Sequence, residues 1–258
     1  MQVKKETISI LGCGWLGFPL AINLIKQGFS VNGSVRSGEK KSLLQSKNIT
    51  PYLIDIDKEN TINVNFLSAD VLVIAIPSKN INGFQKLISQ IEKSSIKRVV
   101  LISSTSVYPN SVQPILESHK TLDTPLASIE TLFFTNQNFK TIILRFGGLF
   151  GAGRNPGNFF SNGRIIKNPD GVVNMIHQED CIAIILKIIE KKSGSEVFNA
   201  CSDTHPTRRE LYTKAKSNLG KEAPVFEENQ SIQMKKISSE KIKEALGFTF
   251  KYSNLLNI

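Results

Sequence analysis

The stretch LGCGWLGFPL, residues 11–20, places Gly12, Gly14 and Gly17 in G-x-G-x-x-G spacing. It overlaps the end of a β-branched run, TISILG, and leads into residues 15–27, whose apolar side chains recur at helical spacing before Gly28. A glycine loop between a strand and a helix is typical of a dinucleotide-binding βαβ unit, and without that context it is only a tight corner. The context here favours the nucleotide site.

Each glycine has a mechanical reason to be there. The first allows the tight turn, the second lets the backbone approach a pyrophosphate, and the third lets the helix pack closely on the strand. Free N–H groups at the helix N-terminus then face the phosphates. We therefore expect five residues of the loop to bind the cofactor: Gly12, Gly14, Trp15, Leu16 and Gly17.

Strand-like and helix-like segments alternate along the first part of the chain. The strand-like runs are 30–35, 51–55, 70–76, 98–104 and 141–146, and an amphipathic helix is expected at 84–93. Alternation of this kind favours a parallel sheet with helices on both faces and with ligands at the carboxyl ends of the strands. The sequence predicts an α/β fold, a Rossmann-type doubly wound parallel sheet with a small C-terminal substrate lobe.

The chain of 258 residues is expected to form a single NAD(P)-binding domain, residues 1–258. After residue 146 the sequence becomes rich in Gly and Asn, and residues 207–258 suggest two short helices and a terminal strand. We predict a core of about 5–150 and 178–200 and a substrate-side lobe of about 151–177 and 201–258.

The second predicted strand ends in GSVRS, which places Arg36 where an NAD site usually carries an acidic residue. Ser34 and Ser37 flank it, and Lys40 and Lys41 follow. An arginine can pair bidentately with a 2′-phosphate and stack on adenine. The expected cofactor is therefore NADP(H) in preference to NAD(H), and Arg36 and Ser37 are expected to bind its 2′-phosphate. The alternative is that Arg36 is simply exposed to solvent.

Charge and composition limit the kinds of partner that the chain is expected to bind. The net charge is +10, but the lysines are dispersed and often stand beside acidic residues, which favours a solvated surface attracting anionic ligands over nucleic-acid binding. Three scattered cysteines match neither a disulfide framework nor a zinc site, so no metal is expected. The same cysteine pattern leads us to expect a reducing, cytoplasmic location. No apolar run is long enough for a membrane span and no signal peptide is recognised, so no membrane association is expected.

Five segments, in order, resemble one family. They are LISSTSVY (101–108), ILRFGGLFGAGRNPG (143–157), NMIHQEDCIAII (174–185), EVFNACSD (196–203) and SSEKIKEALGFTFKYS (238–253). This set is similar to the extended short-chain dehydrogenases/reductases, the NAD-dependent epimerase/dehydratase family. The resemblance implies that Ser104 is the catalytic hydroxyl and that Ile76, Pro77, Phe146 and Gly147 lie on the nicotinamide side of the cofactor.

Two departures from the family pattern concern the loop and the chemistry. Leu11 stands where extended members have their first glycine, a register that resembles the atypical, YeeZ-like branch. The family's Tyr-x-x-x-Lys pair is missing, because residues 121–134 contain neither Tyr nor Lys. A match at Tyr212 and Lys216 falls after the last expected core strand and is interpreted as a coincidence.

The resemblance implies an oxidoreductase that acts on a sugar nucleotide or a small carbonyl substrate, as a monomer or a homodimer. The missing pair leaves a different class open, a non-catalytic regulatory protein that senses NADP(H).

Overall fold

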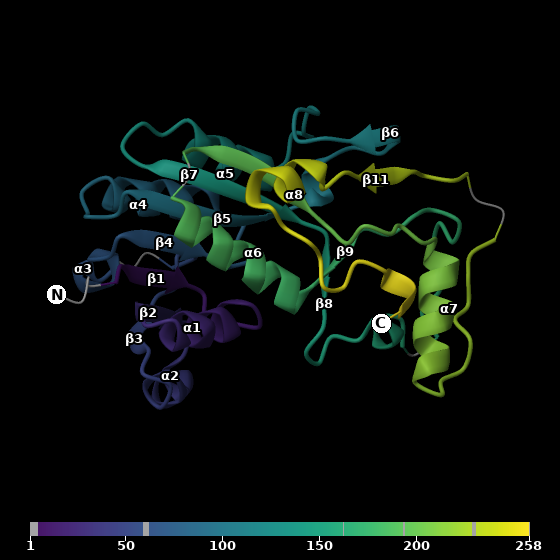
Figure 1. The fold of residues 1–258 in the computed structure, drawn as a ribbon, viewed down its shortest axis with the longest axis horizontal. Helices are drawn as coiled ribbons and strands as arrows, with labels where there is room; N and C mark the ends of the chain where they lie inside the picture. The colour runs from purple at the N-terminus through teal and green to yellow at the C-terminus, as the bar shows by residue number, and fades with distance from the viewer. Residues whose placement is uncertain (1–4, 59–61, 162, 193, 229–230, 258) are drawn as a thin grey trace. The chain divides into compact units, whose positions relative to one another are not determined.

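A computed structural model describes residues 5–58, 62–161, 163–192, 194–228 and 231–257. Its main sheet has seven strands in the order β10-β7-β5-β4-β1-β2-β3 (Figure 1). Their bounds are β1 Thr7–Leu11, β2 Ser30–Val35, β3 Thr50–Leu53, β4 Val71–Ile74, β5 Arg98–Ser104, β7 Lys140–Phe146 and β10 Glu196–Ala200. The strand order reverses between β1 and β4, and ligands of such sheets bind in the crevice at this reversal.

The centre of the sheet is buried on both faces, as the apolar runs predict. All four residues of β4 are fully buried, and β1 pairs in parallel with both β2 and β4. Leu72 and Ile74 pack with Phe66, Phe84 and Phe133 from the helices that cover one face. Because side chains alternate along a strand, Val71 and Val73 face the other side.

The helices are α1 Gly17–Lys26, α2 Lys41–Gln45, α3 Val64–Leu67, α4 Ile81–Ile91, α5 Pro125–Phe134, α6 Gln178–Lys191, α7 Arg208–Asn218 and α8 Glu240–Leu246. Those that pack on the Leu72 face are α3, α4 and α5. Gly17 at the start of α1 lies against Ile10, whose side chain points away from that cluster, so α1 and α4 lie on opposite sides of β1 and β4 (Figure 1). The predicted doubly wound parallel sheet is confirmed.

The chain divides into two compact units. The first comprises residues 1–103, 123–144 and 185–197, and the second comprises 104–122, 145–184 and 198–258. The second contains the small sheets β6–β11 and β8–β9, with β6 Ser111–Ile115, β8 Gly148–Phe150, β9 Met175–His177 and β11 Lys235–Ile237.

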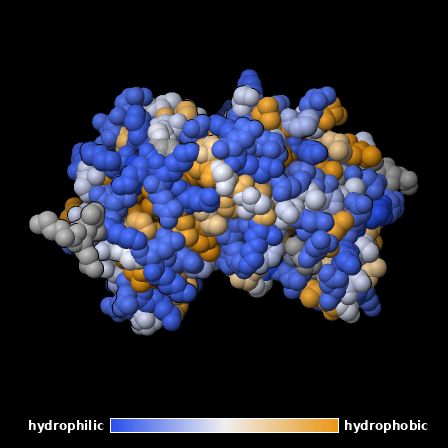
Figure 2. All heavy atoms as spheres, viewed as in Figure 1, coloured by the Kyte–Doolittle hydropathy of each residue, from blue (hydrophilic) through white to orange (hydrophobic). Residues whose placement is uncertain are grey.

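The second unit has a hydrophobic cluster of its own, which joins α7 to the small strands through Phe150, Met175, Leu211 and Leu255. Its last regular element is a short 3₁₀ helix, Leu255–Asn257, so the prediction of a terminal strand is wrong. The preceding residues, Lys251 and Tyr252, are held by their backbone N–H groups on the carboxylate of Asp180, which ties them down without a strand partner. Figure 2 shows a mostly hydrophilic face with apolar residues in small groups.

Candidate functional site

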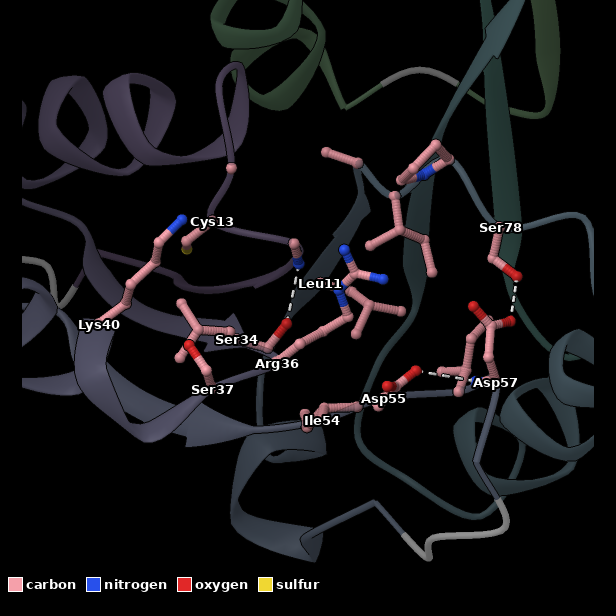
Figure 3. Close-up of a pocket in the computed structure, with 17 residues that line it drawn as sticks. Leu11, Cys13, Ser34, Arg36, Ser37, Lys40, Ile54, Asp55, Asp57 and Ser78 are labelled. Carbon is pink, nitrogen blue, oxygen red and sulfur yellow. Dashed lines mark hydrogen bonds between the residues drawn. The ribbon is translucent and has the colours of Figure 1, made fainter.

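A cavity of about 480 Å³ opens in the first unit at the carboxyl ends of β1 to β4 (Figure 3). Six of the residues expected to bind the cofactor line it: Gly12, Gly14, Arg36, Ser37, Ile76 and Pro77. Trp15, Leu16 and Gly17 lie beyond the lining set, at the turn into α1. The loops after the four strands thus meet at the reversal of strand order.

The glycine loop is shaped by close contacts. Gly12 has a φ of 102°, and a Cβ there would lie 2.6 Å from Ile76 Cγ2 and 2.7 Å from the Ala75 carbonyl oxygen. A Cβ on Gly17 would lie 2.1 Å from the Gly12 carbonyl oxygen, whereas one on Gly14 would meet nothing within 4 Å. Two of the glycines therefore serve the fold, and Gly14 faces open space.

Leu11 explains the unusual register of the loop. It is the last residue of β1, pairs with Ile74 across the sheet and is 1% exposed within the hydrophobic cluster that contains Leu72 and Ile74. The strand thus continues for one more residue, and the turn begins at Gly12. A glycine at position 11 would remove a core side chain.

The end of β2 holds the loop in place. The Ser34 hydroxyl accepts a hydrogen bond of 2.8 Å from the Gly12 N–H, and the Ser34 carbonyl accepts one of 2.8 Å from the Cys13 N–H. Burial raises the pKa of the Cys13 thiol to about 12, so this cysteine stays protonated at neutral pH. Cys13 is a packing residue of the loop rather than a nucleophile.

The N-terminus of α1 is suited to an anion. Its N-cap, Leu16, makes no side-chain cap hydrogen bond, and its first turn holds no acidic residue. The partial positive charge of a helix N-terminus is thus left without a carboxylate from the helix itself. Phosphate oxygens are the usual ligands of such a terminus after a glycine loop.

Two cations reach the cavity from the segment after β2. Arg36 and Lys40 both line it, and Figure 3 shows the Arg36 side chain directed among the lining residues. Ser37 precedes a short 3₁₀ helix, Gly38–Lys40, which brings the Lys40 side chain back to the cavity. Lys41, the next residue, is not among the lining residues.

Sequence reasoning missed the polar residues on the opposite wall. Asp55 and Asp57 follow β3, and Ser78 follows β4. The Asp57 N–H donates to the Asp55 carboxylate at 3.1 Å, and the Ser78 hydroxyl donates to the Asp57 carboxylate (Figure 3). Asp55 ends a strand-like run that the sequence indicated, and Asp57 and Ser78 follow such runs, so the rule that ligands bind at the carboxyl edge could have found them.

Three predicted residues belong to the second unit. The Ser104 hydroxyl accepts from the Ser106 N–H at 3.1 Å and caps a short 3₁₀ helix. Phe146 is 1% exposed, and the Gly147 N–H donates to the Ala200 carbonyl at 3.0 Å. Their assignment to the cofactor and to catalysis stays a prediction.

The two tyrosines nearest to family motifs are structural. Tyr108 is fully buried, donates to Asn199 at 2.9 Å and accepts from Arg145 at 2.5 Å, and burial raises its pKa although Arg145 opposes this. Tyr212 on α7 is 7% exposed, packs edge-on against Phe160, and has a pKa raised by burial. Neither is placed as an accessible acid.

Helix α5 takes the place in the chain of the family's catalytic helix. It carries one ionisable residue, Glu130, which is 3% exposed and accepts a hydrogen bond from the buried Ser103 hydroxyl. Elsewhere in the described chain, no group of three or more His, Cys, Asp or Glu residues gathers as a metal site. None of the helices in this part of the chain has both the length and the hydrophobicity that a bilayer-spanning segment needs.

Comparison with known proteins shows the family to which the chain belongs. Residues 12–191 match the model of a family described as NAD(P)H-binding. Protein YeeZ of Escherichia coli (strain K12) is 29% identical over 273 aligned positions, which cover 97% of this chain and 98% of the relative. The resemblance to the YeeZ-like branch is thereby confirmed.

Solved structures show the same fold. A protein of Silicibacter pomeroyi described as functionally unknown and conserved has a TM-score of 0.82 at 19% identity, covering 98% of this chain and 96% of its own. The UDP-glucuronic acid 4-epimerase of Bacillus cereus, solved with UDP-glucuronic acid and NAD, has a TM-score of 0.79 at 19% identity, covering 97% and 96%. The predicted epimerase/dehydratase-type fold is confirmed.

Proposed function

The chain belongs to the NAD(P)H-binding family, and from that premise we propose that it binds NADP(H) in preference to NAD(H) in the cavity after β1 to β4. The observation that carries the proposal is the pair of cations, Arg36 and Lys40, that line the cavity beyond β2. A 2′-phosphate carries close to two negative charges at neutral pH, and Arg36 offers it a planar fork of donors.

The remaining walls of the cavity suit the other parts of a dinucleotide. Gly14 leaves open space at the helix N-terminus, where a pyrophosphate fits without a side chain in its way. Asp55 and Asp57 can accept hydrogen bonds from an amino group of a base but repel a second phosphate. In the proposed orientation, the 2′-phosphate lies at the cations and the adenine amino group at the carboxylates.

The Bacillus cereus epimerase was solved with NAD, and this chain is proposed to differ from it in cofactor choice. An NAD site commonly places a carboxylate after the second strand to accept from the ribose hydroxyls. Here the position after β2 holds Arg36, with Lys40 from the same segment. A carboxylate in that place would exclude the 2′-phosphate, whereas two cations favour it.

We further propose an oxidoreductase of the epimerase/dehydratase type that acts on a sugar nucleotide or a small carbonyl compound. A bound nicotinamide dinucleotide supplies the hydride-transfer chemistry. Ser104 holds the substrate oxygen, Ile76, Pro77, Phe146 and Gly147 flank the nicotinamide side, and the lobe of residues 151–177 and 201–258 takes the substrate.

The proton that the family's tyrosine would move needs another carrier in this chain. Helix α5 offers only Glu130, and its carboxylate is buried against Ser103. A water molecule held by Ser104 can transfer the proton without a tyrosine, at a slower rate. The proposal therefore predicts weak turnover rather than the rate of a complete Ser-Tyr-Lys set.

Calorimetry with NADPH, NADH and NADP⁺ tests the cofactor, and absorbance at the nicotinamide band over a panel of carbonyl compounds and sugar nucleotides tests the reaction. We expect NADPH to bind at least tenfold more tightly than NADH and one class of substrate to oxidise it. Absence of dinucleotide binding would overturn the whole proposal. Tight binding without oxidation across the panel would replace the oxidoreductase by an NADP(H) sensor.

A further inference from the structure

Ser34 is a cavity residue that no sequence motif identifies as functional. It is 1% exposed, lies in β2 two residues before Arg36, and lines the cavity. Its hydroxyl and its carbonyl each accept a loop N–H, from Gly12 and Cys13, both at 2.8 Å. A single residue therefore holds two consecutive N–H groups of the glycine loop.

The backbone around the two bonds is closely packed. A Cβ on Gly12 would overlap Ala75 and Ile76 after β4, and a Cβ on Gly17 would overlap the Gly12 carbonyl oxygen. Without the hydroxyl, the partly buried Gly12 N–H loses its acceptor, which favours a shift of the turn toward water. The turn leads directly to Gly14 and the α1 N-terminus, where the pyrophosphate is expected.

We propose that Ser34 is a positioning residue for the cofactor: its hydroxyl sets the glycine loop in the form that receives the pyrophosphate. This inference rests on the proposed dinucleotide site and adds to it. Ser34 acts through Gly12 and not through the 2′-phosphate, although it lies next to the cation-bearing segment. Its removal should therefore affect the ligand's two phosphate ends unequally.

The experiment uses two small ligands, each of which carries only one of the two phosphate groups that the site is proposed to bind. ADP carries the pyrophosphate without a 2′-phosphate, and 2′-AMP carries the 2′-phosphate without a pyrophosphate. In Ser34→Ala we expect the Kd of NADPH, NADH and ADP to rise about tenfold, equivalent to ~1.4 kcal/mol. The Kd of 2′-AMP should change less than about twofold.

Two further variants complete the test. Ser34→Thr retains the hydroxyl and should restore ADP binding, and Ser37→Ala is the matched control, which should weaken 2′-AMP and NADPH but not ADP. If Ser34→Ala does not fold, Ser34→Cys keeps the size of the side chain with a weaker acceptor and should show the same ligand pattern.

The outcomes separate this inference from the proposed function. Equal losses for ADP and 2′-AMP, or unchanged ADP binding in a folded Ser34→Ala protein, would overturn the positioning role while the wild-type chain still binds NADPH. Failure of the wild-type chain to bind any dinucleotide would overturn the proposed function itself. A lower melting temperature of the free protein alone, with all affinities kept, would assign Ser34 to the fold.

Discussion

At the scale of single residues, the three glycines of one motif have different tasks. Gly12 needs its positive φ and its close approach to β4, and Gly17 needs its contact with the Gly12 carbonyl. Gly14 has neither constraint, because a Cβ there would meet no protein atom within 4 Å. The open space beside Gly14 leaves room for the pyrophosphate that is proposed to bind there.

This difference predicts opposite effects of two alanine substitutions. Gly17→Ala should lower the free energy of unfolding by about 1–3 kcal/mol, because the added methyl overlaps backbone. Gly14→Ala should change it by less than about 0.5 kcal/mol yet raise the Kd of NADPH at least tenfold. Urea denaturation and calorimetry measure the two effects, and unchanged NADPH binding in Gly14→Ala would contradict the assigned pyrophosphate position.

Arg36 carries the prediction on cofactor choice. Arg36→Asp should raise the Kd of NADPH on the order of 100-fold, because a charge-assisted pair is replaced by repulsion, and should alter the Kd of NADH less than about threefold. Lys41→Asp makes the same change of charge on a residue outside the cavity lining and should leave both nearly unchanged. Equal weakening of both cofactors by Arg36→Asp would show that Arg36 is not the selector.

At the scale of elements, caps rather than propensity define where the second unit's helix α7 begins. The Thr207 hydroxyl accepts from the Glu210 N–H at 3.1 Å, and the Glu210 carboxylate accepts from the Thr207 N–H at 2.8 Å. These bonds lower the pKa of Glu210. The helix packs through Leu211 and Tyr212, so its start also sets the register of that contact.

Loss of this cap should have a modest, measurable cost. Thr207→Ala is expected to lower the free energy of unfolding by about 1 kcal/mol, because the Glu210 N–H loses its hydroxyl acceptor and the reciprocal pair of cap hydrogen bonds is broken. Urea denaturation followed by circular dichroism measures the change. Thr207→Ser keeps the hydroxyl and should retain most of the stability, and an equal loss in both variants would point to the methyl group instead of the cap.

At the scale of the whole molecule, two histidines, the buried His177 and the half-buried His205, make stability depend on pH. Burial lowers the pKa of His177, which stacks on Tyr252 with ring centroids 3.5 Å apart, although Glu179 and Asp180 oppose the shift. Burial also lowers the pKa of His205. In each case the unfolded chain takes up a proton at a higher pH than the folded chain does.

We therefore expect the free energy of unfolding to fall as the pH falls through about 6.5, the ordinary histidine value, because the unfolded state then binds more protons. Asp180, whose pKa burial raises, acts with the opposite sign near the ordinary carboxyl range. Denaturant titrations between pH 7 and 5 should show a smaller slope for His177→Gln and for His205→Gln than for the wild type. An unaltered slope in both variants would contradict the assignment.

The sequence by itself determined the fold class and the position of the glycine loop between β1 and α1. Both depend on local patterns: apolar runs long enough for buried strands, glycines at fixed spacing, and Arg36 directly after a strand. These patterns can be recognised in the sequence because burial and backbone strain restrict the residue types of each segment locally. The departure at Leu11 was visible in the same way, but its reason was not.

Only the tertiary structure showed what surrounds that loop. Asp55, Asp57 and Ser78 come to the cavity because parallel strands end at a common edge, and Ser34 reaches Gly12 across 22 residues of chain. The terminal segment, expected as a strand, is held instead on the Asp180 carboxylate. These contacts join residues that are distant in sequence, and no local pattern encodes a pairing that depends on how the elements pack.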